Sequence, residues 1–151
     1  EIGGSFYPSE LQAAFLFAQL ENLDSNLAQR KTIYDVYRNG LAGLRDDEKI
    51  SFPDMPIGYD SNYHAFYTVF DSELTTDRVR TFLLSNEVQA FIGYVPLHSS
   101  PVGLRMGYSA DSLPRTERVA KCVLRLPLHN NMTADSARTV CSLIGEYFNG
   151  N

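Results

Sequence analysis

Hydrophobic residues follow two different patterns along the first 44 positions of the chain. From Glu10 to Leu20 apolar side chains occupy every face of the expected helix, which predicts a helix that is buried all round. After Leu23 they recur at three- and four-residue spacing, which predicts an amphipathic helix with one apolar stripe. We expect one long helix with a kink near Asp24. The stripe consists of Leu23, Leu27, Tyr34, Tyr37, Leu41 and Leu44, with Arg30 in the remaining slot.

An extended connection, a strand and a helix are expected next. Residues 50–63 contain two prolines and a glycine, which favour an extended connection. The stretch His64–Phe70 is rich in β-branched and aromatic residues, and both of its faces are apolar, so we expect a central strand. Thr75 or Thr76 can cap a helix over Asp77–Asn86, because a threonine hydroxyl accepts a bond from the first helical turn.

The second half of the chain predicts a further strand, a long loop and two more helices. Loops of that length are often functional when they are ordered. These elements are expected at Val88–Val95 (strand), residues 96–112 (loop), Leu113–Val123 (helix), Arg125–Leu128 (short extended segment) and beyond Thr133 (final helix, capped by that threonine). The order predicts one small α/β or α+β domain over residues 1–151, with a mainly antiparallel sheet covered by helices.

Composition and charge narrow the class of protein. The chain has 151 residues, 44% of them hydrophobic and 21% charged, which is typical of an ordinary soluble domain. The net charge is −5 and the basic residues form no stripe, so we expect no nucleic-acid partner. No apolar run approaches the ~20 residues that span a bilayer, so we expect no membrane partner. Cys122 and Cys141 both fall in expected helices, which favours buried free thiols.

The residues themselves offer no self-contained catalytic set. His64, His98 and His129 lack the spacing of metal ligands, so no metal site is expected. A phosphate-binding loop and a nucleophile motif are both missing from the sequence. The three lysines, Lys31, Lys49 and Lys121, are expected on the surface.

One segment does favour a site. Gly93–His98 places the phenol of Tyr94 and the imidazole of His98 at the end of a strand, where ligands often meet open α/β sheets. The alternative is structural: Tyr94 packed as a strand aromatic, and His98 a solvated loop residue.

An ordered set of motifs covering essentially the whole chain resembles the DegT/StrS-type sugar aminotransferases. The segment Tyr94–His98 matches the Tyr-x-Pro-Leu-His segment of that family, and Arg125–Leu128 matches its Leu-Pro-Leu segment before the last helix. The other matching parts are the opening stretch 1–24 with its Ala13-Ala14 and Gln19-Leu20 pairs, Arg30, Tyr37, and the His-containing strand Asn62–Tyr67.

The resemblance implies the small C-terminal domain of the aspartate-aminotransferase fold (fold type I). It implies a cytoplasmic homodimeric parent in which pyridoxal 5′-phosphate (PLP) is bound to a lysine of a large N-terminal domain. The implied donor is glutamate, and the implied acceptor is a nucleotide-linked 4-keto sugar such as dTDP-4-keto-6-deoxy-D-glucose. None of the three lysines here matches the PLP lysine, so we expect that domain to be absent, with no catalytic residue in this chain and no activity alone.

The resemblance also assigns supporting residues. Gly4 and Ser5 fall where relatives carry a turn whose Asn reaches the PLP phosphate of the partner subunit, and a hydroxyl or backbone N–H can donate there. Tyr94 and His98 match the segment that lines the nucleotide-sugar side of the pocket. Gly93 departs from the family, whose close members carry His at that position.

Two other functions remain open on the sequence. The chain is long enough to fold alone, so it could be a stand-alone binding or regulatory module that shares the small-domain fold. It could also be a dimerisation domain, because the apolar helix over Leu11–Leu20, if exposed, predicts self-association.

Overall fold

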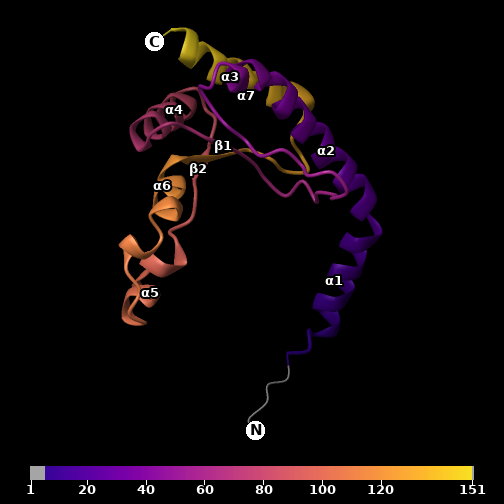
Figure 1. Cartoon of the computed structure of the whole chain (residues 1–151). Helices are drawn as coiled ribbons and strands as arrows, with labels where there is room; N and C mark the ends of the chain where they lie inside the picture. The colour runs from indigo at the N-terminus through magenta and orange to yellow at the C-terminus, as the bar shows by residue number, and fades with distance from the viewer. Residues whose placement is uncertain (1–5, 151) are drawn as a thin grey trace.

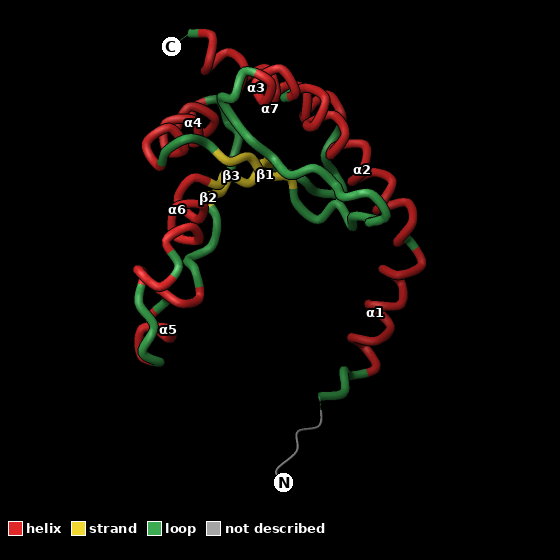
Figure 2. The backbone as a smooth tube through the Cα atoms, viewed as in Figure 1, coloured by secondary structure: helices red, strands yellow, loops and turns green. Residues whose placement is uncertain are grey.

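The chain folds as an arch (Figure 1). The computed structural model describes residues 6–150. Helices α1 (Glu10–Glu21) and α2 (Leu23–Gly40) follow one another along one limb. The other limb carries α5 (Pro101–Arg105) and α6 (Pro114–Cys122), and the strands lie where the limbs meet (Figure 2). The remaining elements are α3 (Ala42–Asp46), β1 (Phe66–Val69), α4 (Glu73–Ser85), β2 (Phe91–Ile92), the 3-10 turns η1 (Leu97–Ser99) and η2 (Ala110–Ser112), β3 (Val123–Leu126) and α7 (Ala134–Asn149).

The predicted long helix is interrupted at Asn22, close to the expected kink. The Asn22 side-chain amide donates to the carbonyl of Ala18 at 3.0 Å, which ends α1 before α2 begins. The burial predicted for α1 is wrong within this chain, because none of its residues is buried, and Leu11 and Phe15 are 85% and 70% exposed. A helix that is apolar on every face needs cover on several sides, whereas within residues 6–150 the main neighbour of α1 is α2, which follows it in the chain.

The sheet has three antiparallel strands in the order β1-β3-β2. The prediction that the strand at residues 64–70 is central is wrong, because β1 lies at an edge and β3 occupies the centre. Within β1, Phe66 and Thr68 are buried whereas Tyr67 is exposed, so only one face is covered. An isolated bridge from Ser51 to Val69 lies on the outer side of β1, which limits its unpaired edge.

The core lies between the covered face of the sheet and three helices. The predicted stripe is confirmed at Tyr34 and Tyr37 of α2 and at Leu41 directly after it, which belong to one core with Phe66 and Leu124. It is wrong at Leu23, which is 44% exposed. The final helix α7 adds Ala137, Val140, Cys141 and Ile144, and α4 adds Thr76, Val79 and Leu83. These contacts confirm the expected fold class, a small antiparallel sheet with helices over one face.

Several local predictions can be checked at helix ends. Thr133 caps α7 as expected, with its hydroxyl accepting from the Ser136 amide at 3.1 Å. The predicted cap of α4 is wrong, because the helix begins at Glu73 and Ser72 accepts from the Thr75 amide at 3.1 Å. Residues 96–112, expected as a loop, contain α5 and the two 3-10 turns.

Both cysteines are free and buried, as predicted. Burial raises the pKa of the Cys141 thiol to about 11, which keeps it protonated at neutral pH. Among the described helices, none has the length and apolar character needed to cross a membrane.

Candidate functional site

The open face of the sheet gathers aromatic side chains around one arginine. Arg125 on the central strand lies directly opposite Tyr67 of β1 and Phe91 of β2. Directly opposed residues of antiparallel strands project from the same face. Tyr67 is partly exposed and Phe91 is 64% exposed, so this face carries none of the cover that buries Phe66 and Leu124 on the other.

Tyr94 lies two residues beyond β2 and contacts the same arginine. The Arg125 Nη1 atom donates to the Tyr94 hydroxyl at 2.9 Å, and the guanidinium carbon lies 5.4 Å from the centre of the Tyr94 ring. Tyr94 is 81% exposed, so it is not a packed strand aromatic. The pair therefore presents a phenol and a guanidinium, held together, to the solvent.

A groove of about 970 Å³ runs past this pair. It is bordered by β2, the end of β3 and the start of α7, and His64 and His129 also reach it. Its charged lining residues in the described chain are Arg125 and Glu87. A volume of this size accommodates a small organic ligand, for which pockets of about 300–1,000 Å³ are usual.

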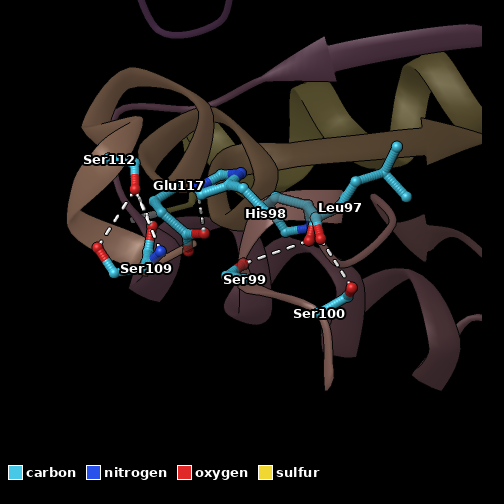
Figure 3. A network of polar contacts seen from close by, with 8 residues as sticks. Leu97, His98, Ser99, Ser100, Ser109, Ser112 and Glu117 are labelled. Atoms are coloured by element: carbon cyan, nitrogen blue, oxygen red, sulfur yellow. Dashed lines mark hydrogen bonds and ion pairs between the residues drawn. The ribbon is translucent and has the colours of Figure 1, made fainter. Parts of the chain in front are cut away.

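His98 takes a different position from Tyr94. Its ring is only 9% exposed and its Nε2 atom lies 3.2 Å from Glu117 Oε1 on α6 (Figure 3). The contact is an ion pair by distance only, since neither of these two buried atoms makes a hydrogen bond among residues 6–150. His98 is therefore not a solvated loop residue, and its imidazole ties the segment after β2 to α6.

The segment around His98, residues 97–103, is closely packed. A Cβ atom on Gly103 would lie 2.2 Å from the Leu97 carbonyl oxygen and 2.5 Å from that of His98, so only glycine fits there. Ser100 caps α5 by accepting from the Gly103 amide at 3.1 Å, and its hydroxyl donates to the Leu97 carbonyl at 2.7 Å (Figure 3). These contacts give the segment after Tyr94 a defined path.

Gly93, the departure from the resembling family, has a steric cause in this chain. A Cβ atom at this position would lie 2.4 Å from the Cγ1 atom of Val123. The Gly93 amide also donates to the Val123 carbonyl at 3.3 Å, which holds the two backbones close together. A histidine at position 93 thus requires either a smaller residue at 123 or a shift of β2.

Two of the motif residues make structural contacts far along the chain. The Tyr37 hydroxyl donates to the Pro127 carbonyl at 2.8 Å, and Arg30 donates to the His64 carbonyl at 3.3 Å. They tie α2 to the Leu-Pro-Leu segment and to the start of β1. Their role in this structure is to support the edge of the groove rather than to line it.

The three lysines lie away from the groove beside Arg125. Lys31 pairs with Asp35 and Lys121 with Glu73, and both ammonium groups are more than half exposed. Lys49 lies 5.9 Å from the centre of the Phe148 ring. The described residues contain no cluster of three or more metal-binding side chains.

Gly4 and Ser5, expected at the PLP phosphate, lie outside the described residues. Sequence reasoning missed Arg125 and Glu117. Arg125 had a detectable signal, since it is a charged residue inside the apolar stretch 122–128. Glu117 had none, because its neighbour His98 is 19 positions away and only the fold brings them together.

Comparison with known proteins places the chain in a family. The DegT/DnrJ/EryC1/StrS aminotransferase family matches residues 2–145, and the chain belongs to that family. PLP dependence is a property of the family.

Individual relatives agree. The dTDP-3-amino-3,4,6-trideoxy-alpha-D-glucose transaminase of Micromonospora megalomicea subsp. nigra is 29% identical over 143 residues, covering 93% of this chain and 37% of that protein. The dTDP-4-amino-4,6-dideoxy-D-glucose transaminase of Escherichia coli is 29% identical over 140 residues, covering 90% and 37%. The chain thus spans well under half the length of these relatives.

A solved structure shows the same architecture. The crystal structure of S. venezuelae DesV in complex with a ketimine intermediate matches with a TM-score of 0.82 and 28% identity, over 96% of this chain and 40% of that one. The expected aminotransferase fold is confirmed.

Proposed function

We propose that this chain is the C-terminal small domain of a PLP-dependent aminotransferase that transfers an amino group from glutamate to a nucleotide-linked 4-keto-6-deoxy sugar. The observation that carries the proposal is the family match over residues 2–145, set beside the chain's coverage of only 37% of a relative's length. A large N-terminal domain would supply the remainder, including the lysine that holds PLP. The parent would be a cytoplasmic homodimer.

The chemistry of the reaction would come from outside this chain. PLP, when bound, supplies an electron sink for the amino-group transfer. The contribution of this chain would be to bind and orient the substrate. Tyr94 would contact the nucleotide sugar through its exposed hydroxyl, and His98 would fix the path of the same segment through Glu117. Gly4 and Ser5 would donate to the phosphate of PLP.

The identity of the sugar is a finer proposal. The serine at position 5 resembles dTDP-4-amino-4,6-dideoxygalactose transaminase, which carries serine where other members have asparagine. We therefore propose dTDP-4-keto-6-deoxy-D-glucose as the acceptor. The two transaminases compared above are named for 3-amino and 4-amino products, so the position of amination is the point that assays must resolve.

The test starts with the gene and uses the full-length product of its reading frame. That product should show the visible absorbance of PLP bound to a lysine, which borohydride reduction removes. With glutamate and dTDP-4-keto-6-deoxy-D-glucose it should form an amino sugar nucleotide, detected by mass spectrometry. The 151-residue chain alone should form none. A reading frame without a large upstream domain before Glu1, or a PLP adduct on Lys31, Lys49 or Lys121, contradicts the proposal.

A dimerisation module is the second candidate, and exposed α1 is the observation that favours it. The large apolar side chains of this helix are at least half exposed, namely Leu11, Phe15, Leu16, Phe17 and Leu20. Contiguous apolar surface of this kind is rarely left in water. The isolated chain should therefore self-associate, and light scattering that shows a monomer at high concentration contradicts this candidate.

A further inference from the structure

We propose that Arg125 and Tyr94 form an oxyanion-binding site on the open face of the sheet. The ligand is a phosphate or a carboxylate group, recognised by the guanidinium and the adjoining phenol. This inference rests on the proposed function only for the source of the oxyanion, which would be the diphosphate of the nucleotide sugar or a carboxylate of the amino donor. The binding chemistry itself stands on the geometry of the chain.

The first observation is that Arg125 has no acidic partner. Four other arginines form ion pairs: Arg38 and Arg45 with Asp54, Arg80 with Asp77, and Arg138 with Asp135. Within residues 6–150, no carboxylate lies within 4.0 Å of the Arg125 guanidinium. A guanidinium carries five N–H donors, and the contact with Tyr94 uses one of them. The others remain for a ligand.

The second observation is that the guanidinium is held in place. Its bond to the Tyr94 hydroxyl fixes one edge, and its backbone belongs to the central strand, paired on both sides. A fixed planar fork binds a carboxylate or phosphate in a bidentate manner and loses less side-chain entropy than a free arginine. Tyr94 is thus a positioning residue for Arg125, and its own hydroxyl hydrogen remains to donate to the ligand.

The third observation concerns the surroundings. Tyr67 and Phe91 lie directly opposite Arg125 on the same face, so aromatic rings flank it on both neighbouring strands. The adjoining groove of about 970 Å³ gives a small ligand room beside the pair. Glu87 is the single carboxylate among the groove-lining residues of the described chain, and no ion pair joins it to Arg125.

The experiment measures binding rather than turnover. The full-length gene product and its variants are titrated calorimetrically with inorganic pyrophosphate and, separately, with succinate. Arg125→Gln should weaken binding of the preferred anion about tenfold or more, because a charge-assisted hydrogen bond of about 1.5–3 kcal/mol is lost. Arg125→Lys should restore only part of the affinity, since an ammonium lacks the planar fork. Tyr94→Phe should weaken it by about threefold, within the range of one neutral hydrogen bond.

Arg105→Gln is the matched control, because Arg105 is an exposed arginine on α5 that does not line the groove. Circular dichroism and the unfolding midpoint confirm that each variant folds. Pyrophosphate binding that depends on Arg125 supports the diphosphate as the source, and succinate binding that depends on it supports the carboxylate. Equal anion affinity in the parent and Arg125→Gln, or an equal loss in Arg105→Gln, overturns the proposal.

The outcome is separable from that of the proposed function. If the gene product lacks aminotransferase activity but still binds pyrophosphate or succinate through Arg125, the proposed function is wrong and the proposed anion site is supported. If the gene product is an active aminotransferase but its anion binding does not depend on Arg125, the proposed function is supported and the proposed anion site is wrong.

Discussion

Helices α1 and α2 are neighbours on one limb of the arch, yet they differ in what they bury. Helix α1 is apolar on nearly every face and buries no residue. Helix α2 is mostly polar, and its single stripe places Ile33 and Tyr37 at 0% exposure. The more hydrophobic of the two helices is therefore the one that the chain leaves uncovered.

The difference shows that the spacing of apolar residues and their number predict different things. The spacing predicts which face of a helix is buried, and the number predicts how many neighbours the helix needs. A single stripe can be covered by one neighbouring layer, which α7 and the sheet provide for α2. Apolar residues on every face require several neighbours, and residues 6–150 do not supply them around α1, since none of its residues is buried. Within the proposed aminotransferase, the missing domain and the partner subunit would supply that cover.

The comparison is tested most directly by removing one phenylalanine side chain from the core and one from α1. Phe66→Ala should cost about 3–5 kcal/mol of unfolding free energy, because Phe66 is 2% exposed and its removal opens a core cavity. Phe15→Ala should change it by no more than about 0.5 kcal/mol. Urea denaturation at low protein concentration measures both. A large loss in Phe15→Ala would show that α1 is packed in solution, and a concentration series then identifies self-association.

The segment that follows Tyr94 is a third case. Here a polar pair, His98 and Glu117, rather than an apolar stripe joins two parts of the chain. Glu117→Leu should cost about 1–3 kcal/mol, because it removes the one carboxylate beside the buried His98 nitrogen, which makes no hydrogen bond within residues 6–150. The double variant His98→Leu/Glu117→Leu should cost less than the sum of the single variants, because no polar atom is then left unpaired. Denaturation of the four proteins completes the cycle. Additive losses would mean that the 3.2 Å contact does not couple these residues.

Substitutions at the helix caps test the same comparison of α1 with the core, with smaller expected changes in the free energy of unfolding. Thr133→Ala should cost about 1 kcal/mol of global stability, because Thr133 caps α7, which is packed in the core. Ser9→Ala removes the capping box of α1, where Ser9 and Gln12 bond one another reciprocally. It should fray α1 without moving the unfolding midpoint, since α1 contributes no core contact. Hydrogen exchange resolves the two effects, and a shifted midpoint in Ser9→Ala would contradict the account.

The smallest expected effect is electrostatic and lies at the junction of α3 with the extended connection. A hydrogen bond and the positive charge of Arg45, with help from Arg38, lower the pKa of the Asp54 carboxyl. Because the folded pKa lies below the unfolded one, the stabilisation is complete above the unfolded pKa and disappears as pH falls through the folded pKa.

Arg45→Gln should therefore raise the pKa of Asp54 toward its ordinary value, as followed by NMR titration of the carboxyl carbon. Arg105→Gln, on the opposite limb, is the control and should leave it unchanged. A pKa of Asp54 that does not respond to Arg45→Gln would show that the pair is broken in solution.

Much of the helical structure could be predicted from sequence, because its causes are local. The stripe on α2, the break near Asp24 and the cap at Thr133 each depend on residues within a few positions of one another. The sheet was less accessible. The segment around Arg125, rather than the apolar stretch at 64–70, forms the central strand. Strand order is set by pairings between residues more than 30 positions apart, which local patterns do not record.

Some features of the site could likewise be predicted from the sequence, and others could not. The position of Tyr94 after a strand and its place in a family motif were visible in the sequence, whereas its exposure became visible only in the structure. The burial of His98 was not visible, since Glu117 lies on another helix. The partnership of Tyr94 with Arg125 was hidden for the same reason.

The sequence by itself determined the long helices, the cap at Thr133, the free buried thiols and, through ordered motifs, the aminotransferase family. Local spacing and residue chemistry are enough for these, because the interactions involved span a few residues. The tertiary structure alone decided that β3 is central, that Arg125 faces Tyr94 without a carboxylate, that His98 turns inward and that α1 stays uncovered. Each of those outcomes depends on which distant segments come to lie together, and no periodicity along the chain records that.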